Sequence, residues 1–138
     1  MAKSTYLAKK TLDHNLGVAA YAMPTVYLGL FTSLVGLADG SLLHEIAGGG
    51  YARQAVSFAA AVDDMAGGKS LSDEDVLFPP ATADWGLMVG WAIMDAQAAG
   101  NILYWGEMPK YGDPADYKRV FSGDRFFVRA EEFSQTEA

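Results

Sequence analysis

Three consecutive glycines at positions 48–50 run directly into a segment of alternating residues at positions 51–58. Glycine adopts positive φ without strain, so three in a row predict a sharp and irregular entry into the next element. Side chains two apart in the following segment share a face, which predicts a β-strand. A phosphate-binding loop needs a strand before its glycines and a helix after them, with Lys-Ser/Thr or a third spaced glycine. We therefore interpret these glycines as a hinge into a strand.

Length and composition exclude several classes of protein. A chain of 138 residues is typical of one domain, and we expect residues 1–138 to form a single domain. The absence of cysteine excludes disulfides, thiolate zinc sites and cysteine nucleophiles, and two histidines leave little for histidine chemistry. A net charge of −7 argues against nucleic acid as a partner, because nucleic-acid binding needs a basic surface. We expect neither a secretion signal nor a membrane span.

One helix is expected near the start of the chain. Residues 4–16 carry Ser4 or Thr5 as an N-cap and are followed by Gly17, where a helix commonly ends. Leu12 and Leu16 lie four residues apart and define a narrow apolar face. A helix this short is marginal in water, so we expect it to pack on its own domain or on a neighbouring subunit.

Short strands are expected along the rest of the chain. They are rich in β-branched and aromatic residues and are bounded by Gly, Pro or Asn, and they span 25–31, 51–58, 75–78, 85–95, 102–107, 117–121 and 124–130. Turns at 97–101 and at 122–123 predict two hairpins.

This order predicts a mainly β fold, an antiparallel β-sandwich or barrel of about six or seven short strands with an N-terminal α-helix. We expect helix 4–16, a β domain at 24–130 and an acidic tail at 131–138. The connection at 32–50 is long and apolar, and such loops are usually functional or disordered.

Several carboxylates and one histidine are candidates for catalysis or cation binding. Asp95 and Glu107 flank the first hairpin and resemble a hydrolase pair, but Asp95 is more typical of a turn cap. His14 lacks a nucleophile elbow and is expected on the helix surface. The acidic residues without EF-hand spacing are interpreted as solvated loops rather than a cation site, and they are Asp63, Asp64, Asp73, Glu74 and Asp75. We assign no catalytic, cofactor-binding or metal residue.

Aromatic residues offer a further alternative. Trp85, Trp91, Tyr104 and Trp105 are of the kind that stack on sugars, although such residues more often fill a core or an interface. Arg53 lies within a predicted strand among apolar neighbours. We expect it to pair with an acidic side chain or to lie across an interface.

Six ordered segments resemble a family of small virion proteins of tailed bacteriophages. They are 10–17 (KTLDHNLG), 24–33 (PTVYLGLFTS), 48–56 (GGGYARQAV), 78–86 (FPPATADWG), 91–96 (WAIMDA) and 100–106 (GNILYWG). The resemblance covers about residues 10–107, and the chain from Met108 onward departs from the family pattern.

The resemblance implies a structural protein of the virion, assembled in the host cytoplasm, without enzymatic activity, cofactor or membrane partner. We expect a capsid-decorating (cement) protein that binds the major capsid protein as a homo-oligomer. A trimer is the state that phage architecture suggests, with helix 4–16 and loop 32–50 contacting neighbours. The alternatives are a tail-fibre or minor tail protein, a carbohydrate-binding module that recognises a receptor, and a small hydrolase using Asp95 and Glu107.

Overall fold

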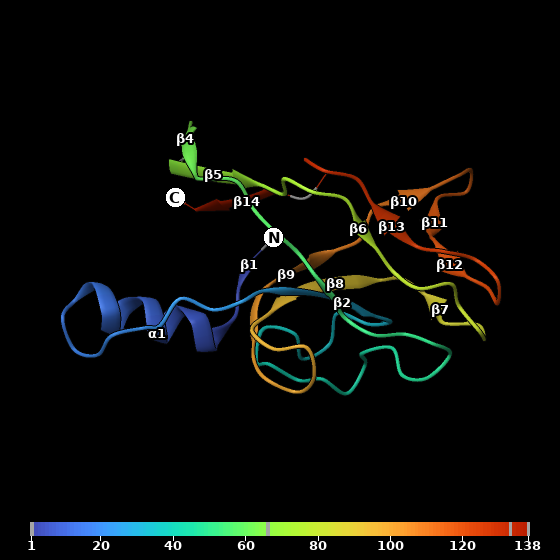
Figure 1. The fold of residues 1–138 in the computed structure, drawn as a ribbon, viewed down its shortest axis with the longest axis horizontal. Coiled ribbons are helices and arrows are strands. Elements are labelled where there is room, and N and C mark those ends of the chain that lie inside the picture. Colours follow the sequence, from blue (N-terminus) through green and yellow to red (C-terminus); the bar gives the residue numbers. More distant parts are fainter. Residues whose placement is uncertain (1, 66, 133, 138) are drawn as a thin grey trace.

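The computed structural model describes residues 2–65, 67–132 and 134–137. One helix, α1 (Thr5–Asn15), lies beside antiparallel β-ladders (Figure 1). The central sheet has the order β1 (Ala2–Lys3), β9 (Ile102–Glu107), β8 (Gly90–Met94), β2 (Tyr27–Phe31) and β3 (Gln54–Ala55). The smaller ladders are β10 (Lys110–Tyr111) with β11 (Asp116–Tyr117), β12 (Arg119–Val120) with β7 (Gly86–Leu87), β13 (Phe127–Val128) with β6 (Val76–Leu77), and β14 (Ser134–Glu137) with β5 (Gly67–Leu71) and β4 (Val62–Asp64).

The predicted fold class, mainly antiparallel β with an N-terminal helix, is confirmed. The described residues form fourteen strands, whereas about six or seven were expected. Five of them, β1, β4, β5, β10 and β14, lie where no strand was expected, and the expected strand at 85–95 is divided into β7 and β8. Closure into a sandwich or a barrel stays a prediction.

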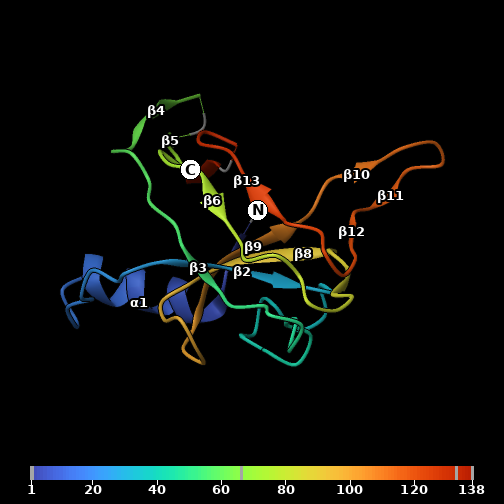
Figure 2. The same cartoon turned by 45° about the vertical axis from the view of Figure 1, so that its right-hand side comes forward.

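The central sheet is covered on both faces. Side chains alternate along β2 and β8, so that Leu28, Leu30, Trp91 and Ile93 belong to one core cluster while Phe31, Ala92 and Met94 belong to another. The smaller ladders cover the first face through Val76, Phe78, Trp85, Met88, Val120, Phe126 and Val128. Loop 32–50 covers the second face through Leu37, with Leu34 and Leu42 beside it. Figure 2 shows the ladders and this loop on opposite sides of the sheet.

The predicted helix is confirmed, but its buried face is not the expected one. The Ser4 hydroxyl accepts a hydrogen bond from the Leu7 amide at 3.1 Å and donates to the Ile102 carbonyl, so the N-cap also joins α1 to β9. Leu7 is buried, whereas Leu12 and Leu16 are exposed. Only the first turns therefore pack on the sheet, and the C-terminal half extends away from it (Figure 1).

The first predicted hairpin is confirmed and the second is wrong. Strands β8 and β9 pair across the expected turn, with Gly90 opposite Glu107 and Met94 opposite Ile102. Segments 117–121 and 124–130 do not pair with each other, since β12 pairs with β7 and β13 pairs with β6. The sequence indicates a turn at Ser122–Gly123, but it does not indicate that the segments on both sides of the turn pair with strands distant in the chain.

Three other expected elements are corrected. The strand at 85–95 is interrupted at residues 88–89, where the Met88 amide bonds to the Lys118 carbonyl at 2.8 Å. Within 51–58 only β3 is a strand, and Arg53 and Val56 are both buried although they are three apart. Residues 134–137 of the expected tail form β14, paired with β5. Phe133 of that tail lies outside the described residues.

Candidate functional site

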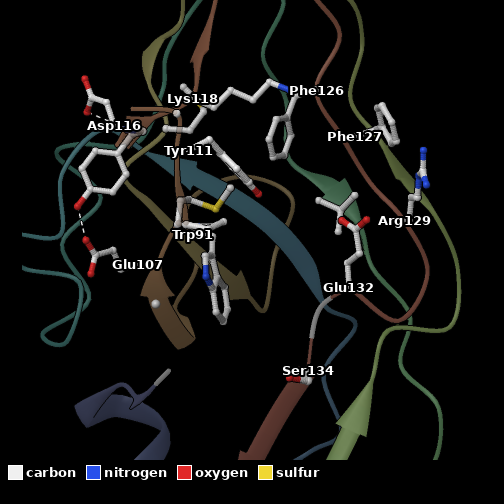
Figure 3. Close-up of a pocket in the computed structure, with 17 residues that line it drawn as sticks. Trp91, Glu107, Tyr111, Asp116, Lys118, Phe126, Phe127, Arg129, Glu132 and Ser134 are labelled. Atoms are coloured by element: carbon white, nitrogen blue, oxygen red, sulfur yellow. Dashed lines mark hydrogen bonds between the residues drawn. The ribbon is translucent and has the colours of Figure 1, made fainter. Parts of the chain in front are cut away.

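A groove of about 1000 Å³ opens between the β10–β11 hairpin and β13. Trp91 and Phe126 belong to the core and lie at its base, and Tyr111 stands on the hairpin side. Phe127 alternates with the buried Phe126 and Val128 and lies on the outer side of β13 (Figure 3). The Tyr111 and Phe127 rings are 63% and 47% exposed, so they present their surfaces to solvent. The volume lies at the upper end of the range for ligand clefts, about 300–1,000 Å³.

Charged groups of both signs line the same groove. Tyr117 donates its hydroxyl proton to Glu107, and this hydrogen bond raises the pKa of the Tyr117 phenol. The Arg129 guanidinium lies 5.8 Å from the centre of the Phe127 ring. Across the described residues, no hydrogen bond or ion pair engages the ammonium of Lys118 or the carboxylate of Glu132. The groove thus combines exposed aromatic faces with unused donors and acceptors.

A second surface surrounds the free end of α1. We call it the helix-tip surface and define it by four exposed apolar residues, Leu12, Leu16, Val18 and Met23. Leu16 is 75% exposed and Met23 is 94% exposed. Solitary exposed apolar residues are ordinary, but four within twelve positions, at the end of a projecting helix and just after it, are typical of an interaction surface.

An apolar pocket of about 280 Å³ adjoins the helix-tip surface. It lies between α1 and the sheet, and Leu7, Tyr21, Pro24 and Leu103 are among its lining residues. The Tyr21 hydroxyl is buried and has no hydrogen-bond partner among the described residues, and burial raises its pKa. Buried polar atoms are normally paired, so this atom calls for an explanation.

Arg53 pairs with an acidic side chain, which confirms the first of the two expectations for this residue. It is only 3% exposed and forms a bidentate pair with Glu45, both contacts measuring 2.7 Å. Its remaining guanidinium nitrogen donates to the carbonyls of Ala96 and Ala99 at 2.8 and 2.6 Å. The Arg53 side chain therefore serves the interior of this chain and not an interface.

The proposed pair of Asp95 and Glu107 is contradicted by the strand register. Glu107 faces Gly90 while Asp95 follows Met94, so the two lie roughly 17 Å apart along the ladder at about 3.4 Å per residue. Glycosidase pairs stand about 5–9.5 Å apart. Asp95 instead accepts hydrogen bonds from the backbone and side-chain nitrogens of Asn101, at 2.7 and 3.0 Å. The prediction that Asp95 caps a turn is confirmed.

The other polar candidates also have structural roles. His14 lies exposed on α1, as predicted, and its Nδ1 atom accepts a hydrogen bond from the Tyr21 amide at 3.1 Å. The Asp75 carboxylate accepts from the Ala130 amide at 2.8 Å, and Asp63 and Asp64 lie exposed on β4. Across residues 2–65, 67–132 and 134–137, no three His, Asp or Glu residues gather as a metal site requires. No helix in the same residues has the length and apolar character that a membrane crossing needs.

The four aromatic residues proposed for sugar stacking do not form one platform. Trp85 and Trp91 are buried in the core on one face of the sheet, and the Trp85 Nε1 atom donates to the Gly49 carbonyl at 2.7 Å. Trp105 packs against the cluster on the opposite face. The expectation that such residues more often fill a core is therefore confirmed for Trp85 and Trp91, and the alternative that these two rings stack on a sugar is wrong because neither is exposed.

The groove residues were missed by the sequence analysis. Residues 108–117 were interpreted as a loop because they hold two prolines and a glycine, yet they contain β10 and β11. The available signal was a pair of tyrosines, Tyr111 and Tyr117, on either side of a Gly-Asp-Pro turn, which is typical of a hairpin.

The chain is thus an antiparallel β protein with a projecting helix and an open groove, in which Asp95 and Glu107 are separated. Residues 2–136 match the family model described as "Podophage GP4 fiber I protein gp80". The chain belongs to this family, which confirms the resemblance to virion proteins of tailed phages and makes this a virion-associated fibre protein. No curated protein matches the chain.

Proposed function

We propose that this fibre protein is a non-enzymatic component of the virion that assembles as a homo-oligomer through its helix-tip surface. The observation that carries the proposal is the exposure of Leu12, Leu16, Val18 and Met23 at the free end of α1. Such residues are stabilised when they are removed from water, at about 25 cal/mol per Å² of apolar surface.

A second copy of this chain is the occupant that best fits the helix-tip surface. The same side of the molecule offers exposed apolar side chains and, beside them, the apolar pocket lined by Leu7, Tyr21 and Pro24. A protrusion next to a recess makes a surface complementary to itself, as closed symmetric assemblies require. An acceptor from the neighbouring copy would also satisfy the Tyr21 hydroxyl. A trimer is the state we expect from phage architecture.

Loop 32–50 is the second surface proposed to contact a partner. Leu37 anchors the loop to its own sheet, while Val35 and Leu43 remain exposed. We propose that this face attaches to the virion, with the major capsid protein as partner and capsid decoration as the role. Attachment as a tail fibre or minor tail protein is the alternative, and the word fibre in the family description favours a projecting appendage.

The absence of enzymatic activity is part of the proposal. The separation of Asp95 from Glu107 supports it, since the pair weighed from the sequence stands at opposite ends of one hairpin.

The oligomer is tested by measuring molar mass with light scattering during size-exclusion chromatography. The wild-type chain is expected to elute as a closed oligomer, and Leu16→Glu is expected to shift it toward the monomer. Met65→Glu is the matched control, because Met65 is also apolar and exposed but lies outside the helix-tip surface. A wild-type monomer at every concentration, or equal dissociation by both variants, contradicts the proposal.

The place on the particle is tested by cryo-electron microscopy of purified virions with antibody labelling. Density repeated over the capsid lattice supports decoration, whereas a few copies at the tail vertex support the tail alternative. Absence of the protein from purified virions contradicts the structural role in both forms.

A further inference from the structure

The outer side of residues 125–129 presents side chains that neither the family description nor the assembly proposal uses. Buried and exposed side chains alternate along this extended segment. Its buried members, Phe126 and Val128, belong to the core. Its exposed members, which we call the arginine face, are Arg125, Phe127 and Arg129. We propose that the arginine face binds an extended acidic segment of a different protein, with carboxylates on the two arginines and an apolar side chain between them.

An apolar patch lies between the two arginines. Leu77 on β6 is directly opposite Phe127 on β13, and these side chains are 50% and 47% exposed. Residues directly opposite in an antiparallel pair have Cβ atoms about 4.5–5.5 Å apart on the same face, so the two side chains form one continuous patch. An apolar side chain docked between the arginines would remove this patch from water, which favours binding.

Both arginines are held in place and keep donors free. The Arg125 Nε atom donates to the Phe78 carbonyl at 2.8 Å, and the Arg129 guanidinium lies 5.8 Å from the centre of the Phe127 ring (Figure 3). Within the part of the chain that the structure describes, neither guanidinium forms an ion pair with a carboxylate. A guanidinium presents paired N–H groups that match the two oxygens of a carboxylate, and one that is already positioned loses less freedom on binding.

The distribution of charge favours an acidic partner. Residues 118–129 hold four of the ten basic residues of the chain but only one of its 17 acidic residues, although the whole chain has a net charge of −7. Asp84 is already paired with Arg119 at 3.0 Å, and Glu131 and Glu132 follow the arginine face and bound it at that end. The face is therefore a positive region on an acidic protein, and it attracts a negatively charged segment.

The spacing of the two arginines defines the partner and argues against a second copy of this chain. Arg125 and Arg129 are four residues apart, which is about 13 Å along an extended backbone. Alternate side chains of a strand share a face, so a matching segment has two acidic residues four apart with an apolar residue midway. No two acidic residues of this chain lie four apart in the sequence. A second copy therefore has no extended segment of this kind to offer.

Nucleic acid is the competing ligand, since arginine also binds phosphate. Nucleic-acid affinity depends on many phosphate contacts, whereas this face offers two free guanidinium groups on a chain with a net charge of −7. The acidic segment is therefore the better match, because it needs only two carboxylates and also covers the apolar patch of Leu77 and Phe127.

The test uses the full chain and a fluorescent synthetic peptide with Glu-Thr-Phe-Thr-Glu at its centre, and binding is measured by fluorescence anisotropy. One comparison peptide has the same composition with its two glutamates adjacent, and another has lysines in place of the glutamates. We expect the spaced peptide to bind at least about fivefold more tightly than either comparison peptide, because only its carboxylates reach both arginines.

Three variants of the chain test the face itself. Arg125→Gln, Arg129→Gln and Phe127→Ala are each expected to weaken binding of the spaced peptide at least about fivefold. Lys10→Gln is the matched control, because it removes the same charge from an exposed position on α1 and is expected to leave the affinity unchanged. Circular dichroism and the unfolding midpoint establish that each variant keeps its fold, which exposed positions allow.

The proposal is overturned if the spaced peptide does not bind, or if the peptide with adjacent glutamates binds as tightly. It is also overturned if the three variants bind as the wild type does, if Lys10→Gln weakens binding as much as they do, or if a single-stranded oligonucleotide binds more tightly than the peptide. Leu16→Glu is expected to leave the affinity for the peptide unchanged, so failure of this proposal and failure of the oligomer proposal are separate outcomes.

Discussion

The Arg53 guanidinium and the Glu45 carboxylate form two parallel contacts of 2.7 Å in the interior of the protein. Glu45 belongs to loop 32–50, and the same arginine reaches the Ala96 and Ala99 carbonyls in the turn between β8 and β9. One side chain therefore joins the covering loop, the approach to β3 and the hairpin turn. The pair matters more for fixing these segments than for net stability, since the desolvation of buried charges offsets much of their attraction.

Arg53→Gln is expected to lower the free energy of unfolding by about 3–5 kcal/mol, because it leaves the Glu45 charge buried without its partner. Arg119→Gln is the matched control, since Arg119 forms a 3.0 Å pair with Asp84 at the surface. Removing such an exposed pair costs about 0–1 kcal/mol. Urea denaturation followed by circular dichroism compares the two, and equal losses would contradict the role assigned to Arg53.

Tyr51→Phe tests the hydroxyl that completes the same cluster. This hydroxyl donates to Glu45 at 2.7 Å and accepts from the Leu30 amide at 3.0 Å. Its removal leaves a backbone N–H group unpaired, so a loss of about 1–3 kcal/mol in the free energy of unfolding is expected. Tyr111→Phe, on an exposed ring, is expected to change this free energy little, and urea denaturation near neutral pH measures both variants.

Stability at alkaline pH gives a further test of Tyr51. Burial, followed by the nearby Glu45 charge, raises the pKa of Tyr51 well above its ordinary value. Above about pH 10 the unfolded chain releases this proton while the folded chain retains it, so stability present below that pH is lost as the pH rises. Denaturation at about pH 8 and about pH 11 is expected to show a smaller advantage of wild type over Tyr51→Phe at the higher pH. An advantage that grows with pH would contradict this assignment.

Gly49→Ala tests the close approach of the glycine hinge to Trp85. A Cβ atom at position 49 would lie 2.9 Å from the Trp85 Nε1 atom, on a backbone with φ of 59°. Gly48→Ala is the matched control, because φ there is 75° and nothing lies within 4 Å of the added atom. The control is expected to lose about 1–2 kcal/mol from positive φ alone, and Gly49→Ala to lose more. Thermal and urea unfolding measure the difference, and equal losses would show that the contact is unimportant.

Ser4→Ala tests the attachment of α1. The Ser4 hydroxyl caps the helix and bonds to β9, so its loss is expected to cost about 1–2 kcal/mol and to release the helix from the sheet. Hydrogen exchange is expected to quicken along α1 and to change little in β8. Ser33→Ala is the control, because the Ser33 hydroxyl accepts a hydrogen bond from the Val35 amide in an exposed loop. Unchanged protection of α1 in Ser4→Ala would contradict this anchoring role.

The elements that the sequence predicted well are those with strong local signals. Ser4 and Gly17 bound the helix, and the turn before Asn101 gives the hairpin of β8 and β9. The capping role of Asp95 is local as well, since its partner Asn101 is six residues away. In each case the residues that make the structure are neighbours along the chain.

The elements that the sequence predicted poorly depend on distant partners. Arms 117–121 and 124–130 look like a hairpin, yet their strands pair with residues 86–87 and 76–77. The helix face was assigned to Leu12 and Leu16, whereas the contact with β9 buries Leu7 and leaves both of these exposed. Local pattern cannot decide which of two apolar faces meets the sheet, because that choice depends on where the sheet lies.

The glycine hinge shows the same division. The sequence by itself determined that residues 48–50 make a sharp turn, because three glycines tolerate the positive φ values of 75°, 59° and 79° found there. Only the tertiary structure decided what the turn is for: it brings the Gly49 carbonyl to the Trp85 indole and the Thr82 amide, at 2.7 and 2.9 Å. Backbone freedom is a property of the residue, whereas the partner that makes use of it is set by packing across the fold.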